Sequence, residues 1–201
     1  MTAAAIFEGI AAISQLGMTL AVATGVWVAY RQLHVWREQD IQKKRADVAE
    51  ELVAASLEVS DTLKRLRSLF DQIPEDQVGN RSYVYEKRLE RFNDAAERFQ
   101  LLRRLQIRAS ALLGDKHIDE SVDVLFEVRQ KVIVAIQMLS DRHEFYGDED
   151  EETRELYKRM RRDMWGSYGE KHDPLGMKQL DAIDSLEAKL TPFIRYENSA
   201  Q

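Results

Sequence analysis

Cysteine is absent from this chain of 201 residues, and proline and glycine are scarce, with three and nine copies. Without cysteine, the chain has no disulfide bridges, thiolate metal sites or cysteine nucleophiles. Scarce proline and glycine favour long helices, because these residues end or interrupt helices. No segment alternates apolar and polar residues as a half-buried strand does, so the sequence predicts an all-α fold.

Charge is almost missing from the first thirty residues, where Glu8 is the one charged side chain. The whole chain has 29 Lys and Arg, 35 Asp and Glu and a net charge of −6, so its charge belongs almost entirely to residues 31–201. The stretch Gly9–Tyr30 carries no formal charge and gives roughly 33 Å of helix at about 1.5 Å per residue. That length is enough to cross the hydrocarbon core of a bilayer, although alanine, glycine, threonine and Gln15 make the stretch only moderately apolar.

The residues that follow this stretch predict its orientation. Trp27, Tyr30 and Trp36 suit a headgroup layer, where amphipathic rings are enriched. No basic residue precedes the stretch. Five basic residues follow it: Arg31, Arg37, Lys43, Lys44 and Arg45. The positive-inside rule therefore predicts a single-pass anchor over residues 1–30 of a bacterial inner-membrane protein, with the N-terminus outside and a cytoplasmic helical domain over residues 31–201. The alternative is an unusually long, uncharged core helix of a soluble protein.

Small residues recur at every fourth position of the uncharged stretch, and such rows let helices approach closely in lipid. They are Gly17, Ala21 and Gly25. We expect this row to support a homo-oligomer. A polar row lies roughly on the opposite face, at Glu8, Gln15 and Thr19. This row either faces the oligomer interior or a wet pore, or has a plainer explanation, with Glu8 among the outer headgroups and Gln15 tolerated.

Apolar periodicity predicts that the membrane helix continues to about Ile73 and ends before Pro74. Its inward positions are Ile41, Val48, Leu52, Ala55, Val59, Leu63, Leu66, Phe70 and Ile73. A second helix is predicted over 82–113, where Gly114 ends it. A third helix, over 117–145, is the most apolar of the cytoplasmic helices and is expected at the centre of a bundle.

Two shorter helices complete the predicted bundle. The first carries apolar residues from Leu156 to Met164 and follows the acidic residues 147–152. The second begins at the Asp173–Pro174 pair, a good N-cap and first turn, and runs to about Thr191, where Pro192 stops or kinks it. Short loops between the helices predict antiparallel packing.

The sequence carries no motif for catalysis, for a cofactor or for a metal ion. Its four histidines lack the Glu-x-x-His pairs of di-iron bundles, and its glycines form neither a phosphate-binding loop nor a nucleophile elbow. His117 and Glu120 make a single pair, too few ligands for a metal site. The Arg–His spacing of helical nucleases of the HEPN class is also missing, so we expect the protein not to be an enzyme.

Basic residues gather late in the predicted second cytoplasmic helix, at Arg98, Arg103, Arg104 and Arg108, and again at Lys158, Arg159, Arg161 and Arg162. The first group is a candidate anion-binding face for RNA, a nucleotide messenger or lipid headgroups. The alternative is a solvated helix face that pairs with neighbouring acids. No aromatic residues are interleaved for base stacking, so sequence-specific nucleic-acid binding is not expected. The expected partners are the bilayer, further copies of the chain and an anionic or protein partner.

The residues between the last two predicted helices are unlike plain packing sequence. Trp165, Tyr168, His172 and Asp173 lie close together at a helix-loop-helix junction. Such a loop is either a contact site for a partner or a lid in which Trp165 plugs the end of the bundle.

Several features together suggest a family. The uncharged N-terminal helix ends in Trp and Tyr and is followed by arginine and a long helix. The closing segment contains Met164-Trp165-Gly166, Asp173-Pro174-Leu175, Ile183, Leu186, Glu187 and Leu190-Thr191-Pro192-Phe193-Ile194. This order resembles an uncharacterised family of bacterial single-pass membrane proteins with a helical cytoplasmic domain. More loosely, the layout is similar to the small membrane accessory protein of RNA-targeting CRISPR loci, which forms an oligomeric pore from N-terminal helices. Neither resemblance implies site residues here.

These features predict a membrane-anchored, non-enzymatic helical scaffold or signalling protein that self-associates. One alternative is an oligomeric membrane pore that acts in phage defence. Another is a helical nuclease that lacks a recognisable motif.

Overall fold

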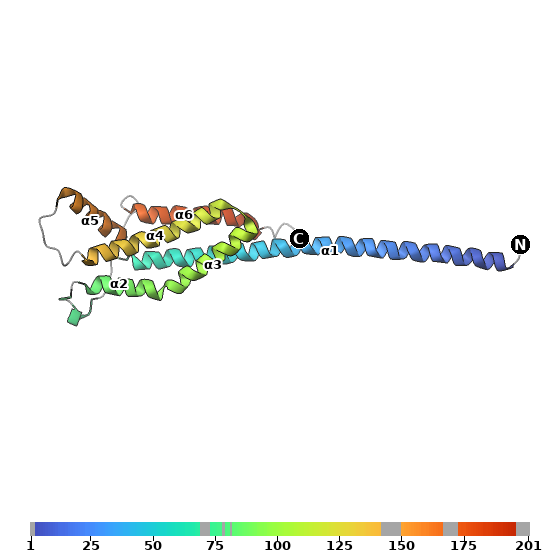
Figure 1. Ribbon diagram of the computed structural model, residues 1–201, viewed down its shortest axis with the longest axis horizontal. Coiled ribbons are helices and arrows are strands. Elements are labelled where there is room, and N and C mark those ends of the chain that lie inside the picture. The colour runs from blue at the N-terminus through green and yellow to red at the C-terminus, as the bar shows by residue number, and fades with distance from the viewer. Residues whose placement is uncertain are drawn as a thin grey trace. The chain divides into compact units, whose positions relative to one another are not determined.

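The computed structural model describes residues 3–68, 73–77, 79–80, 82–141, 150–166 and 173–195, with the side chains of residues 3–16 and Thr19 outside the description. Within these residues the fold is all-α, which confirms the all-α part of the predicted fold (Figure 1). The chain divides into two compact units, Met1–Lys44 and Arg45–Gln201. Helix α1, Ala3–Leu66, contributes to both units.

The first unit consists of α1 as far as the structure describes it. Every described side chain from Gly17 to Ile41 is exposed. Within the part of the chain whose side chains are described, no helix is both long enough and apolar enough to cross a membrane. The predicted stretch Gly9–Tyr30 lies within α1, and the side chains of residues 9–16 and Thr19 are not among those described.

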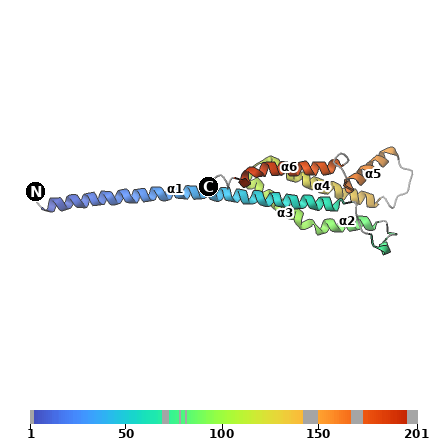
Figure 2. The same ribbon diagram turned by 180° about the vertical axis from the view of Figure 1, so that it is seen from behind.

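The second unit is a bundle of the later part of α1 with five more helices: α2 (Tyr83–Asp94), α3 (Ala96–Leu113), α4 (Lys116–Asp141), α5 (Glu151–Met164) and α6 (Pro174–Ile194). A short 3-10 turn, Glu75–Gln77, precedes α2. Helix α4 packs against α2, α3, α5 and α6, which confirms that the third predicted helix lies at the centre. Figure 1 and Figure 2 show α3 and α6 on different sides of the later part of α1.

The predicted apolar stripes form the core of this bundle. From α1 the buried residues include Val48, Leu52, Ala55, Val59, Leu63 and Leu66. They pack in one cluster with apolar residues of α2 to α6, such as Phe92, Leu102, Leu125, Ile136, Leu186 and Leu190. Burial of this apolar surface is the main force that holds the helices together. Two residues predicted to point inward are exposed instead: Ile41 is 49% exposed, because the bundle begins only after it, and Ile73, beyond the end of α1, is 46% exposed. Phe70, also predicted to point inward, lies outside the described residues.

Three helix boundaries differ from the predictions. Helix α1 ends at Leu66 and not near Ile73, and the helix predicted over 82–113 is two helices, separated at Ala95. Helix α6 continues through Pro192 to Ile194, beyond the predicted stop. The predicted end of the third helix at residue 145 falls outside the described residues, which include α4 up to Asp141.

The first two differences have physical causes, a contact between helices at the first break and local sequence at the second. The carbonyl oxygens of Leu66, the last residue of α1, and of Ser68 just after it accept hydrogen bonds from Arg88 of α2, which satisfies carbonyl groups at this helix end. At the second break, Asn93 and Asp94 are weak helix formers, and the N–H of Ala95 is shared between two preceding carbonyl groups. Neither break carries the glycine or proline from which helix ends are usually predicted.

Candidate functional site

The predicted small row lies on the exposed surface of α1 in the first unit. Gly17, Ala21 and Gly25 are all exposed, and a Cβ atom added at either glycine would meet no atom within 4 Å. The row is therefore open to contact with another helix. The polar row of Glu8, Gln15 and Thr19 also lies on α1, but these side chains are outside the described ones.

Large apolar side chains surround α1 over the same segment. Met18 exposes 70% of its surface, Val26 64% and Trp27 60%. At about 100° per residue, Trp27 and Val28 point roughly 180° and 280° away from Met18 around the helix axis. The exposed apolar surface is therefore not one stripe for one partner helix but extends around the helix.

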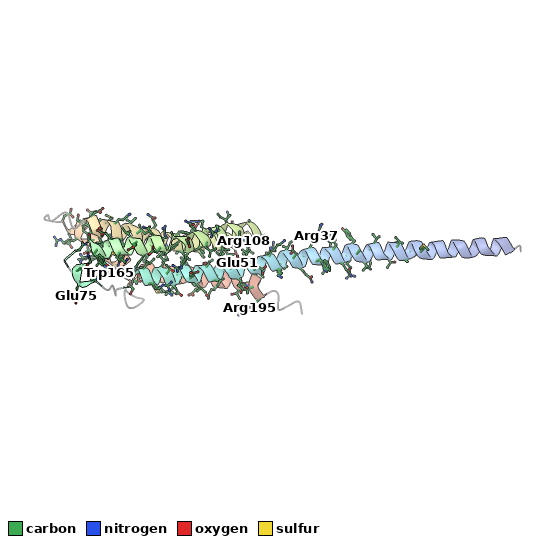
Figure 3. All side chains as sticks on the ribbon, turned by 90° about the horizontal axis from the view of Figure 1, so that it is seen from below. Arg37, Glu51, Glu75, Arg108, Trp165 and Arg195 are labelled. Carbon is green, nitrogen blue, oxygen red and sulfur yellow. The ribbon has the colours of Figure 1, made fainter. Side chains whose placement is uncertain are left out.

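Cations and aromatic rings follow this apolar segment. The Arg31 guanidinium lies 5.8 Å from the centre of the Trp27 ring, a cation–π distance. The rings of Tyr30 and His34 meet edge to face, with centroids 4.6 Å apart. Arg31, Arg37 (Figure 3) and Lys43 are exposed and lie roughly 120° apart around the helix, so positive charge is offered on every side.

The arginines predicted as an anion-binding face lie on α3, and two of them form ion pairs with α1. Arg98 Nε lies 2.7 Å from a carboxylate oxygen of Glu58. Arg108 Nη1 lies 2.8 Å from a carboxylate oxygen of Glu51, and these two residues are labelled in Figure 3. Both pairs are about half exposed, so each contributes little to stability. Their order along the two helices shows that α1 and α3 run antiparallel, as predicted from the short loops.

The other two arginines differ from each other. Arg103 Nη1 lies 3.0 Å from Asp123 Oδ1 of α4, and the Arg103 guanidinium carbon lies 4.0 Å from the centre of the Phe126 ring. Arg104 is exposed and has no hydrogen bond, ion pair or ring contact with any other described residue. It borders a shallow groove of about 370 Å³ that is lined by Glu58, Asp94, Glu97, Arg98, Leu101 and Arg104. Three of the four predicted arginines thus have acidic partners within the fold, and one does not.

A buried arginine that the sequence analysis did not single out joins three segments at one end of the bundle. Arg67, just after α1, donates from Nε to the carbonyl oxygen of Asp163 at 2.9 Å and from Nη2 to that of Arg162 at 3.4 Å. Its Nη2 also lies 2.6 Å from Asp173 Oδ1. The guanidinium therefore caps the C-terminal end of α5, where the helix dipole is negative, and holds the residue that begins α6.

Asp173 is the N-cap of α6, as predicted from the Asp-Pro pair. Its Oδ1 accepts a hydrogen bond of 2.9 Å from the N–H of Gly176. A Cβ atom added at Gly176 would collide with this carboxylate, so a side chain there would displace the cap. The N–H of Gly166, at the end of α5, donates to the carbonyl oxygen of Arg67 at 2.8 Å.

A second buried arginine, Arg88 of α2, lies at the same end of the bundle. It donates to the carbonyl oxygens of Leu66 at 2.6 Å and Ser68 at 2.5 Å, and its guanidinium stacks 4.1 Å from the centre of the Trp165 ring. Trp165 is half-buried in this position and packs against the core of the bundle. Tyr168 and His172, the other aromatic residues of that loop, lie outside the described residues. Only the long-range packing reveals Arg67 and Arg88, because nothing distinguishes them from surface arginines in the sequence.

Two shifted pKa values in the bundle have structural causes, ion pairing for one and burial for the other. Hydrogen bonds from Lys131 and Lys178 lower the pKa of Glu127 to about 2, on the exposed surface between α4 and α6. Burial raises the pKa of Asp163, beside the Arg67 cluster. Among the described residues, no group of three or more histidine, aspartate or glutamate side chains is arranged to hold a metal ion.

Comparison of the chain with protein-family models, with curated proteins and with solved structures finds no match.

Proposed function

We propose that this protein is a non-enzymatic helical scaffold or signalling protein, anchored in a bacterial inner membrane through Gly9–Tyr30 and self-associating there. One observation carries the proposal, namely the exposed apolar surface that surrounds α1 in the first unit. A helix that is apolar on all sides requires an apolar environment on all sides, which a bilayer supplies. The charge-free length of roughly 33 Å, the aromatic rings and the cations that follow support the same assignment.

The two alternatives have weaker support. A pore depends on Glu8, Gln15 and Thr19, whose side chains are not described. A nuclease depends on an Arg–His arrangement that the sequence lacks. The scaffold is favoured because the second unit uses its buried charged residues to join helix ends.

Charge placed in the middle of the apolar segment is expected to release the protein from membranes. An Arg at a helix centre costs about 2.5–3.5 kcal/mol on insertion, so Met18→Arg with Val22→Arg should exceed what a moderately apolar helix tolerates. The measurement is the share of full-length protein that stays in bacterial membranes after an alkaline carbonate wash.

The matched control places the same two charges beyond the segment, as Gln32→Arg with Gln39→Arg on the exposed part of α1. This control should stay with the membrane as the parent chain does. Release of the parent chain by carbonate, or equal retention of both variants, would contradict the anchor.

The small row is expected to mediate association in the membrane. Gly17→Leu with Gly25→Leu should lower the oligomeric mass in detergent, measured by light scattering, because bulk at these positions keeps helix backbones apart. Ala23→Leu with Val26→Leu changes roughly the opposite face of α1, where both side chains are exposed, and serves as the control. An unchanged mass in the glycine variant would rule out this row as the interface.

A further inference from the structure

The outer face of α6 carries three carboxylates that have no partner. Asp181, Asp184 and Glu187, called here the carboxylate stripe, are exposed. Their side chains form no hydrogen bond or ion pair with the rest of the described chain. Like charges three and four residues apart on a helix repel one another. The stripe would therefore be stabilised by a cationic surface that covers it.

The outer face of α3 offers such a surface. The arginine face consists of Arg103, Arg104 and Arg108 around Ile107, which is 63% exposed. Arg104 has no partner among the described residues. Arg103 and Arg108 use only part of their five N–H donors, Arg103 toward Gln106 and Asp123 and Arg108 toward Glu51. An exposed apolar residue among arginines has a composition that protein interfaces favour.

The two faces lie at the same level of the bundle, because both helices bond to the same turn of α4. In α3, Gln106 Nε2 donates to the carbonyl oxygen of Asp119 at 3.1 Å. In α6, the hydroxyl of Ser185 lies 3.1 Å from that of Ser121. Figure 1 and Figure 2 show α3 and α6 on different sides of the later part of α1, so the two faces belong to separate surfaces of the bundle.

We propose that the carboxylate stripe of one copy docks on the arginine face of a second copy. Because the two faces are different surfaces of one chain, the contact is heterologous and repeats from copy to copy, as a row or a closed ring. Opposite charge steers the copies together and fixes their register, while Ile107 is covered in the contact. The inference rests on the proposed function in one respect, since anchors in one membrane give all copies the same orientation.

The absence of cysteine makes a cross-linking test direct. Ile107→Cys and Ala188→Cys place one thiol in each face, at exposed and uncharged positions. Oxidation of membranes that contain the full-length double variant should give a ladder of disulfide-linked oligomers, and neither single variant should do so. Ala54→Cys of α1 with Ala188→Cys is the matched control, because Ala54 is exposed on another face. A membrane-bound double variant that stays monomeric on oxidation would overturn the proposal.

Charge reversal in the double-cysteine chain tests the pairing itself. Arg104→Asp should lower the cross-linked fraction by roughly tenfold, and Asp184→Arg should do the same, since each places like charges in contact. The chain with both reversals should regain the ladder. If the cross-linked fraction of the combined variant stays as low as that of the single reversals, Arg104 and Asp184 do not pair across the contact.

The same samples report separately on the anchor. Retention after the carbonate wash is measured beside the ladder. Retained protein without a ladder overturns the contact between copies and leaves the anchor intact. Protein that washes off overturns the anchor.

Discussion

Replacing Arg67 by alanine is expected to lower the free energy of unfolding by about 3–5 kcal/mol, the loss typical when one partner of a buried ion pair is removed. The Arg67 side chain is only 4% exposed and lies 2.6 Å from the carboxylate of Asp173. Without it, that carboxylate and the last carbonyl oxygens of α5 lose a buried donor, and water does not replace it easily. The measurement is urea unfolding of the full-length chain in mild detergent, followed by circular dichroism.

Two further variants make this result specific. Lys64→Ala removes an exposed pair with Asp61 at 3.6 Å and should change the free energy of unfolding by no more than about 0.5 kcal/mol. Arg67→Lys keeps the charge but cannot reach three acceptors with a planar fork, so it should recover only part of the loss. Equal urea midpoints for Arg67→Ala and Lys64→Ala would show that the Arg67 cluster does not hold the helices together.

Shortening Leu125 to alanine is expected to cost about 2–5 kcal/mol of unfolding free energy. Leu125 is fully buried at the middle of α4, the helix on which the others pack. The substitution removes apolar contacts and leaves a cavity that a close-packed bundle only partly fills. The same urea experiment measures the effect.

The control for this second prediction is Leu101→Ala on α3, where the side chain is 39% exposed. Truncation at this position leaves no enclosed cavity, so the cost should stay below about 1 kcal/mol. Similar costs at Leu101 and Leu125 would mean that the interior of the bundle is not packed around α4.

Much of this fold follows from features that act over one or two helical turns. The helical spacing of Leu52, Leu63 and Leu125 predicts buried positions, because each helix must bury one apolar stripe. Asp173 caps α6, and Gly114 ends α3 with a left-handed φ of 68°, both as the residue types predict. The stretch Gly9–Tyr30, which carries no formal charge, is equally visible without any structure.

Contacts between residues far apart in the chain decide the rest. Arg67 meets Asp173 across 106 positions, and Arg88 donates hydrogen bonds to the carbonyl oxygens of Leu66 and Ser68 at the end of α1. In the sequence, both arginines look like the solvated Arg104. Whether an arginine is buried beside hydrogen-bond acceptors depends on where α2, α5 and α6 pack, and no local sequence pattern encodes that packing. Periodicity and capping thus determine the helices, whereas packing of distant segments determines which charges are buried as ties between helix ends and which stay on the surface.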